Sequence, residues 1–173
     1  MNPEEQCAEA KKLYEAGDLN GALRAFEQAR AGYLARNDSA HAAAVANDLG
    51  VVYYLVGRRN DARQVLQNAL ATFEQLGDTL GQAKALGNLA RVLERDGDRE
   101  NAEKNYQRAA ELFHQVGEKG FEADTWRVLS QMQLQRGRWL EALATYDRAL
   151  AAKGGSGALR AFLQIPLRLI GAR

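Results

Sequence analysis

The sequence has few of the residues that crosslink or interrupt a chain. Among its 173 residues there are one cysteine, Cys7, and two prolines. A lone cysteine excludes an internal disulfide. With 46% hydrophobic residues and so little proline, the composition favours a folded, mostly helical protein. The formal net charge of +1 gives no overall attraction to nucleic acid or to an anionic membrane, so any electrostatic preference must be local.

Long apolar runs are also missing. No stretch approaches the roughly 18 consecutive apolar residues that a membrane-spanning helix requires. The first residues, MNPEEQCAEAKK, carry acids where a secretion signal has a basic region followed by an apolar one. These absences predict a soluble, cytoplasmic protein, and the alanine- and arginine-rich composition is typical of a bacterial source.

No arrangement of residues indicates catalysis or cofactor binding. His41 and His114 are 73 residues apart, and neither has Cys, His or paired acids at the spacing of metal ligands. Lys11 and Lys12 near Cys7 favour its thiolate, but no base is placed to orient a nucleophile. Phosphate-binding loops of the GxGxxG or Gly-Lys-Ser/Thr type are absent. We therefore predict no catalytic residue, no metal site, no cofactor and no enzymatic activity.

One motif is present four times. Gly17, Gly57, Gly97 and Gly137 are 40 residues apart, and apolar residues at helical spacing stand on both sides of each glycine. This predicts two helices joined at the glycine, which can adopt the left-handed conformation that ends a helix. Three further sets of residues follow the same period: Ala22, Ala62, Ala102 and Ala142; Phe26, Leu66, Tyr106 and Tyr146; and Ala29, Ala69, Ala109 and Ala149.

These sets predict how the helices pack and where they begin. A small residue lets the neighbouring helix approach closely, and the large residue four positions later fills the adjoining space, so we expect all of them in the core. Asp18 and Asp98 stand where an N-cap is wanted. Asp78 or Thr79 is expected to cap the next helix, with Gln82 completing a Thr-x-x-Gln box.

The motif resembles the tetratricopeptide repeat, whose pattern is W-x2-L-G-x2-Y followed by A-x3-F. Leu49, Gly50 and Tyr53 match its first half, and Trp126 and Leu129 match it again with serine in place of the glycine. The Ala22 and Phe26 sets match its second half. The period is 40 residues, whereas the common one is 34 and closes with a proline, so the chain is similar to the long-helix subclass of the family.

The resemblance implies an all-α, right-handed solenoid of four antiparallel helix pairs. The repeats are expected at about residues 3–38, 39–78, 79–118 and 119–153, within one domain over 1–153. Residues 154–173 begin with a glycine-rich break and continue with apolar and basic residues. They predict a C-terminal capping helix, with a dimer contact or a contact to an anionic membrane as alternatives.

In proteins of this family the first helices line a concave groove that binds peptides. The groove is expected on the side opposite the core residues, because residues at i, i+4, i+7 and i+11 share one face of a helix. This face is basic and rich in amides, which suits a peptide segment with acidic residues, extended or helical. Its residues are Lys11, Tyr14, Asn47, Val51, Tyr54, Lys84, Asn88, Arg91, Arg95, Arg127, Gln131 and Leu134.

The carboxylate clamp of chaperone-binding members is not reproduced, because Cys7 and Asp48 stand where it needs polar or basic side chains. The sequence thus predicts a noncatalytic, monomeric adaptor that binds a partner protein's peptide in the groove. One alternative is a self-associating assembly subunit that uses the C-terminal helix, and another is a membrane-tethered assembly factor. Nucleic acid is not an expected partner, because the net charge is near zero and few aromatic residues lie on the face.

Overall fold

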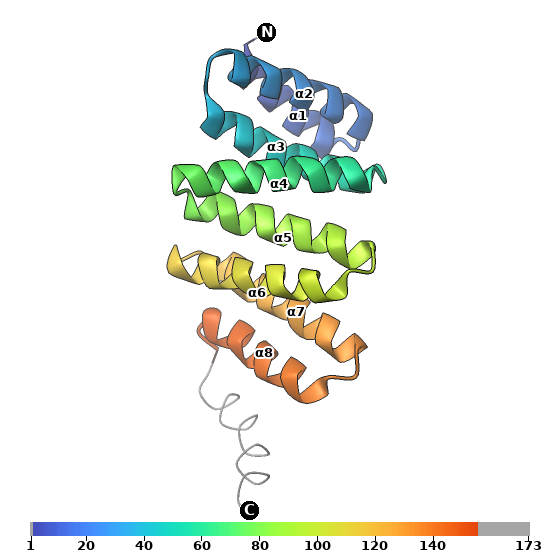
Figure 1. Ribbon diagram of the computed structural model, residues 1–173, viewed down its shortest axis with the longest axis vertical. Coiled ribbons are helices and arrows are strands. Elements are labelled where there is room, and N and C mark those ends of the chain that lie inside the picture. The colour runs from blue at the N-terminus through green and yellow to red at the C-terminus, as the bar shows by residue number, and fades with distance from the viewer. Residues whose placement is uncertain (1, 156–173) are drawn as a thin grey trace, which may run out of the picture. The chain divides into compact units, whose positions relative to one another are not determined.

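The computed structural model describes residues 2–155, and this part of the chain is helical with short turns and no strand (Figure 1). The predicted all-α class is therefore confirmed. The helices are α1 (Pro3–Glu15), α2 (Leu19–Ala35), α3 (Ser39–Leu55), α4 (Arg59–Leu76), α5 (Thr79–Arg95), α6 (Arg99–Gln115), α7 (Lys119–Gln135) and α8 (Trp139–Ala152). Of the expected C-terminal helix, residues 156–173 lie outside the described residues.

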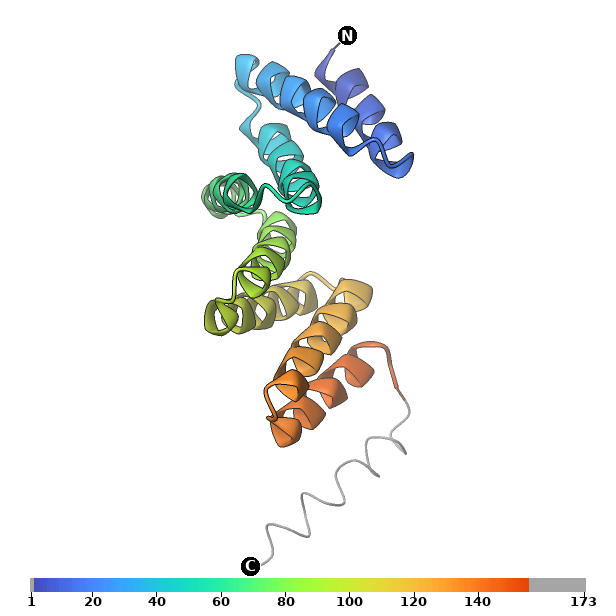
Figure 2. The same ribbon diagram turned by 90° about the vertical axis from the view of Figure 1, so that its right-hand side faces the viewer.

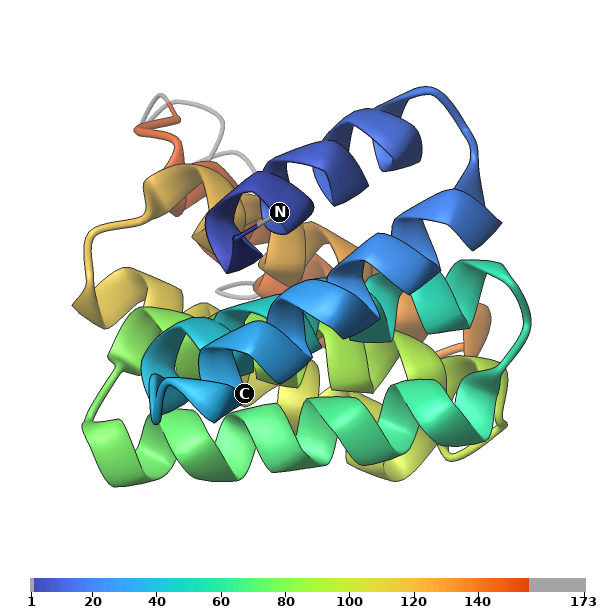
Figure 3. The same cartoon turned by 90° about the horizontal axis from the view of Figure 1, so that it is seen from above.

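The helices belong to two compact units, which divide within α6. The first unit ends at Asn105 and the second begins at Tyr106. In the first unit, successive helices pack on one another from α1 to α5, and α3 also packs on α5. Figures 2 and 3 show α1 and α2 side by side, with the chain reversing its direction at the turn between them. In the second unit, α7 packs on α8.

The turn inside each pair has the conformation expected from its glycine. Gly17, Gly57, Gly97 and Gly137 have φ angles of +82°, +82°, +87° and +72°. Only glycine adopts this region without a steric penalty from a Cβ atom, which explains its recurrence at this place. The prediction that these glycines end the first helices is confirmed.

Side-chain caps begin several of the helices. The Asp18 carboxylate accepts a hydrogen bond from the Gly21 amide at 2.8 Å, as predicted. At the start of α5 the cap is Asp78, which accepts from the Gly81 amide at 2.9 Å. The predicted Thr-x-x-Gln box is wrong, because the Gln82 side chain instead donates to the Phe73 carbonyl at 3.3 Å. Asp78 is the N-cap of α5 because its carboxylate reaches the free backbone amides of the first helical turn.

The repeated alanines are fully buried. Ala22, Ala62, Ala102 and Ala142 are each 0% exposed, so their predicted place in the core is confirmed. Gly50 shows how tight the packing is, because a Cβ atom at this position would lie 2.4 Å from Cγ of Leu66. The glycine of the repeat motif therefore makes room for the large residue of the partner helix.

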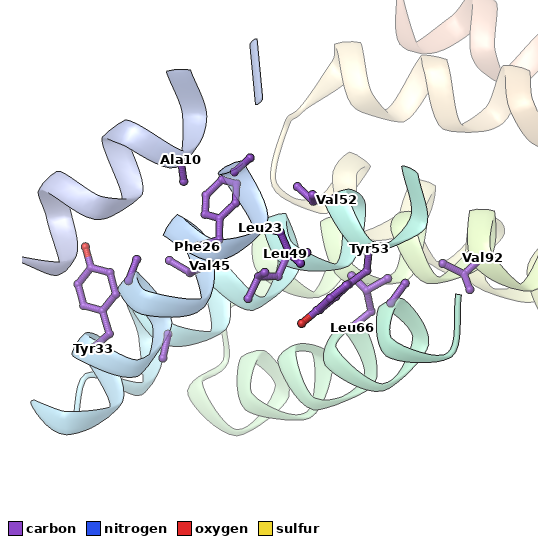
Figure 4. Close-up of a cluster of buried hydrophobic side chains, with 14 of the residues drawn as sticks. Ala10, Leu23, Phe26, Tyr33, Val45, Leu49, Val52, Tyr53, Leu66 and Val92 are labelled. Carbon is purple, nitrogen blue, oxygen red and sulfur yellow. The ribbon is translucent and has the colours of Figure 1, made fainter. Parts of the chain in front are cut away.

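The core of the first unit is shared by consecutive pairs (Figure 4). One cluster of buried side chains includes Ala10 of α1, Phe26 of α2, Leu49 of α3, Leu66 of α4 and Val92 of α5. Each pair thus completes the core of its neighbour, which is the way that helical repeats gain stability.

One predicted core position is exposed. Phe26, Leu66 and Tyr106 are 3%, 0% and 5% exposed, but Tyr146, their equivalent in the last pair, is 41% exposed. The prediction that Tyr146 is core is therefore wrong for the described residues. The physical reason is that α8 is the last described helix, so no described pair follows it to cover this side chain.

Candidate functional site

The first helices of the first unit carry most of the predicted groove residues. We use the term first-helix face for Lys11, Tyr14, Asn47, Asp48, Val51, Tyr54, Lys84, Asn88, Arg91 and Arg95, which lie on α1, α3 and α5. The cationic side chains and Tyr14 are exposed, Val51, Tyr54 and Asn88 are half-buried, and Asn47 is buried. The face therefore has basic side chains at its surface and amide groups deeper in.

Two hollows open on this face, and both are bordered by Lys11 and Asp48. The first has a volume of about 300 Å³ and is lined by Lys11, Tyr14, Phe26, Asp48, Val51 and Val52. Its walls are largely apolar, so it can receive an apolar side chain. The second has a volume of about 280 Å³ and is lined by Lys11, Ala44, Asn47, Asp48, Phe73, Asp78, Leu80, Gly81 and Lys84. It contains amide, carboxylate and ammonium groups.

A polar network links α3 and α5 beneath this surface. Nδ2 of Asn88 donates a hydrogen bond to Oδ1 of Asn47 at 3.0 Å. The Asn47 side chain also forms a hydrogen bond with Asp48. Asn47 was predicted as a groove residue, but its amide is buried and engaged with its neighbours. Asn88 is the more accessible of the two amides.

Asp48 lies on the face but was not among the predicted groove residues. Burial raises the pKa of its carboxyl, while Lys11, the hydrogen bond from Asn47, and Lys84 oppose that rise. The 40-residue period could have found it, because Asp48 stands at the position that Asn88 occupies in the next repeat. A carboxylate at this place prevents a uniformly basic groove.

Cys7 also differs from expectation. The sequence predicted that nearby lysines favour its thiolate. Burial instead raises the pKa of the Cys7 thiol, and Asp48 adds to this effect while Lys11 opposes it. The thiol form is therefore favoured, because a charged sulfur would lose hydration in this half-buried position.

Four cations of the first-helix face are exposed to solvent. They are Lys11, Lys84, Arg91 and Arg95, and the charges of Lys11 and Lys84 act on the half-buried Asp48 carboxyl. The arginines of α4 differ, since Arg59 Nε lies 2.9 Å from Asp96 Oδ1 and Arg63 pairs with the same carboxylate. The face therefore retains positive charge that an incoming anionic group can neutralise.

The remaining predicted groove residues lie in the second unit. Arg127, Gln131 and Leu134 are exposed on α7. Arg127 Nη2 is 3.4 Å from Asp124 Oδ1, and Lys153 Nζ is 3.2 Å from the same oxygen. This part of the predicted surface is therefore less basic than the first-helix face. The hollows of the first unit are formed without these residues.

The described part of the chain has neither a metal-binding cluster nor a helix that could span a membrane. Over residues 2–155, no group of three or more His, Cys, Asp and Glu side chains is arranged to hold a metal ion. None of the helices in this range is both long and apolar enough to cross a membrane.

The comparison with family models decides the classification. Models described as the tetratricopeptide repeat match residues 42–76 and residues 81–153. The chain belongs to the tetratricopeptide repeat family. Tetratricopeptide repeats generally mediate protein–protein binding and are generally noncatalytic, so the repeats support an interaction scaffold. The comparison with curated proteins gave no match to the sequence of the chain.

Solved structures of similar fold support the helical-repeat architecture. BtubC from P. vanneervenii superposes with a TM-score of 0.79 at 19% identity over 88% of this tetratricopeptide repeat chain. Aspartyl phosphate phosphatase F from Bacillus subtilis superposes with a TM-score of 0.82 at 14% identity, again over 88%. The matches span 63% and 40% of those two proteins. At these identities the likeness concerns the fold alone.

Proposed function

We propose that the protein is a noncatalytic adaptor that holds an extended segment of a partner protein on the first-helix face. The segment carries acidic residues and one apolar side chain. The observation that carries this proposal is the set of four exposed cations on this face, Lys11, Lys84, Arg91 and Arg95. Lys11 and Lys84 border the hollows at which such a segment would be held.

The chemistry of the face favours this ligand. The forked guanidinium of Arg91 can bind a carboxylate through two hydrogen bonds, and such charge-assisted pairs are stronger than neutral ones. The Asn88 amide can pair with the backbone of an extended chain. Tyr14 provides a rigid apolar wall next to Val51 in the first hollow.

Asp48 limits which segment fits. Its carboxylate borders both hollows, so an acidic side chain placed in either would meet a like charge. The acids of the ligand are therefore expected at the rim, near Lys84 and Arg91, with the apolar side chain in the hollow lined by Tyr14 and Val51. The preferred segment therefore has one apolar residue with acidic residues on both sides of it.

Charge reversal on the face tests the proposal. The variant Lys84→Glu/Arg91→Glu is compared with Arg24→Glu/Lys104→Glu, which makes the same change in net charge at exposed residues of α2 and α6. The probe is a synthetic peptide with one leucine flanked by glutamates. We expect the first variant to weaken binding about tenfold or more and the control to leave it nearly unchanged.

Two further measurements complete the test. Added salt should weaken peptide binding to the wild type, because exposed charges are screened beyond a Debye length of about 8 Å at physiological ionic strength. Pull-downs from lysate with the same variants, after circular dichroism has shown that they fold, then identify the partner. Equal retention of the peptide by both double variants would show that the acidic segment does not bind this face.

A further inference from the structure

The second unit has a hollow of its own, bordered by α6, α7 and α8. Its volume is about 440 Å³, and its lining includes Glu111, His114, Glu122, Trp126 and Arg148. Trp126 and Glu122 are 5% and 7% exposed, whereas His114 and Arg148 are exposed. The hollow therefore combines a buried aromatic ring and a buried carboxylate with charged or polar side chains that reach solvent.

The equivalent place in the first unit has a different character. Two repeat periods earlier, a hollow of only about 70 Å³ is bordered by α2, α3 and α4. Four equivalent pairs of residues line the two hollows: Leu34 and His114, Ala42 and Glu122, Ala46 and Trp126, and Asn68 and Arg148. The first unit shows that helix packing needs no charge at these places. Because burial of a carboxylate costs free energy unless the group is paired, the acid in the second unit indicates a role beyond packing.

The Glu122 carboxylate can accept further hydrogen bonds. Nδ1 of His114 lies 3.1 Å from both of its oxygens, Oε1 and Oε2. One ring nitrogen thus faces two oxygens, while a carboxylate has about four acceptor positions. The Glu122 side chain is 10% exposed, so an incoming group that reaches it would be largely removed from water. A cation with several N–H groups suits such an acceptor.

Glu111 gives the hollow a second carboxylate at a less buried place. Its Oε1 accepts a hydrogen bond from Nε2 of Gln107 at 3.0 Å, and its Oε2 lies 3.6 Å from Nη1 of Arg108. The Glu111 and Arg108 side chains are 40% and 53% exposed, and ion pairs between exposed groups are weak. Glu111 can therefore exchange this partner for another cation.

The Trp126 ring already accepts a cation from the chain itself. The guanidinium carbon of Arg148 lies 5.0 Å from the centre of the ring. The face of an indole ring attracts a cation electrostatically, and tryptophan does so more strongly than tyrosine or phenylalanine. Because Arg148 is an exposed residue on α8, its side chain can leave the ring when another cation takes its place.

We propose that this hollow binds an arginine or lysine side chain from a basic segment of a partner protein. The charged head pairs with Glu122 and Glu111, and the apolar stem lies against Trp126. Two carboxylates against one guanidinium favour a cation over an anion as the occupant. The hollow shares no residue with the first-helix face, so this proposal does not depend on the acidic segment proposed for that face.

Binding of a basic peptide to the full chain tests the proposal. The probe is a synthetic peptide with arginines among neutral residues, and the reference is the same peptide with citrulline, an uncharged analogue, in place of arginine. Trp139→Phe leaves Trp126 as the only tryptophan, so the emission of this ring reports binding at the hollow. We expect the arginine peptide to change the emission and to bind about tenfold more tightly than the citrulline peptide.

Variants in the same background distinguish a cationic from an anionic ligand. Glu111→Gln/Glu122→Gln should weaken binding of the arginine peptide about tenfold or more, and Glu111→Gln alone about threefold. Arg148→Ala should bind this peptide at least as tightly as the parent, because the competing cation is gone. The control Glu100→Gln/Glu141→Gln makes the same charge change at exposed residues of α6 and α8 and should leave binding nearly unchanged.

Circular dichroism establishes that each variant folds. Equal affinity for the arginine and citrulline peptides, or for the arginine peptide in the parent and in Glu111→Gln, would overturn the proposal. Loss of binding in Arg148→Ala, or a preference for a peptide with glutamates in place of the arginines, would show that the hollow takes an anion and would also overturn it. So would self-association, seen by sedimentation, that Glu111→Gln/Glu122→Gln removes, because the occupant would then be a second copy.

Discussion

At the scale of single residues, Asn47 and Asp48 determine the character of the first-helix face. The Asn47 amide joins α3 to α5 through Asn88, so it serves the packing of first helices. Asp48 places a half-buried carboxylate between Lys11 and Lys84. The first-helix face therefore has a carboxyl group at the border of both hollows, and in the proposed function this group limits where the acids of a ligand can lie.

Replacing Asp48 by asparagine should stabilise the protein at neutral pH. Burial raises the pKa of the Asp48 carboxyl above 3.8, the value it has when unperturbed. As the pH rises through 3.8, the unfolded chain loses this proton first, which favours unfolding until the folded carboxyl has also ionised. Below this window both states are neutral and the penalty is absent. Urea unfolding from about pH 3 to about pH 8 should therefore show a stability gain for Asp48→Asn only above the window.

Asp38 provides a control, because its carboxyl pKa is shifted in the opposite direction to that of Asp48. The hydrogen bond from the His41 backbone amide, and then that from its side chain, lower the pKa of the Asp38 carboxyl. Asp38→Asn should consequently lose stability at neutral pH and match the wild type in acid. Equal pH profiles of Asp48→Asn and the wild type would show that burial of the Asp48 charge has no effect on stability.

At the scale of helices, the repeated alanine of the second helix sets how closely a pair packs. Ala62 is fully buried on α4, and Gly50 on α3 leaves no room for a Cβ atom next to Leu66. Gly50 on α3 and Ala62 on α4 are thus both small, and Gly50 leaves the space that the Leu66 side chain occupies. The same helix has Ala71 at an exposed place, where no neighbour limits the size of the side chain.

The substitution Ala62→Leu should overpack this contact. We expect a loss of about 1–3 kcal/mol in the free energy of unfolding, because the added atoms force the two helices apart or push Leu66 from its rotamer. Ala71→Leu on the same helix is the matched control and should change the stability by less than about 0.5 kcal/mol. Urea titration monitored by circular dichroism measures both, and similar stabilities of the two variants would contradict the packing argument.

At the scale of the whole molecule, the chain comprises two units that each have buried residues of their own. The cluster of the first unit contains Phe26, Leu49 and Leu66, and buried Trp126 and Leu129 lie in the second. In helical repeats each pair is stabilised mainly by its immediate neighbours. Damage in one unit should therefore have a limited effect on residues of the other.

Trp126→Ala tests this locality. Trp126 is 5% exposed, and the Arg148 guanidinium carbon lies 5.0 Å from the centre of its ring. Removing the ring should cost about 3–5 kcal/mol through lost contacts and the cavity it leaves. Hydrogen exchange should become faster in α7 and α8 but stay near wild type in α1 to α4. Leu66→Ala is the reciprocal control in the first unit, and uniform acceleration over the chain in either variant would show a single cooperative unit.

Much of the fold was predictable because it depends on local chemistry. The glycines at 17, 57, 97 and 137 have the left-handed conformation that their place between apolar stripes predicts. The alanines at 22, 62, 102 and 142 are buried as their period predicts. The candidate site was predictable only in part. Helical spacing placed the exposed cations on one face, but it did not reveal that Asn47 is buried or that Asp48 shares its surroundings.

The sequence by itself determined the repeat, its period, the helix ends and the residues that allow close packing, because each follows from the conformational freedom or size of one side chain. Only the tertiary structure decided the burial of Asp48, the hydrogen bond from Asn88 to Asn47, and the exposure of Tyr146. The physical reason is that burial and charge environment are set by helices distant in the sequence. The same repeat position is buried where a described pair follows it, as at Phe26, and exposed at Tyr146, after which the structure describes no further pair.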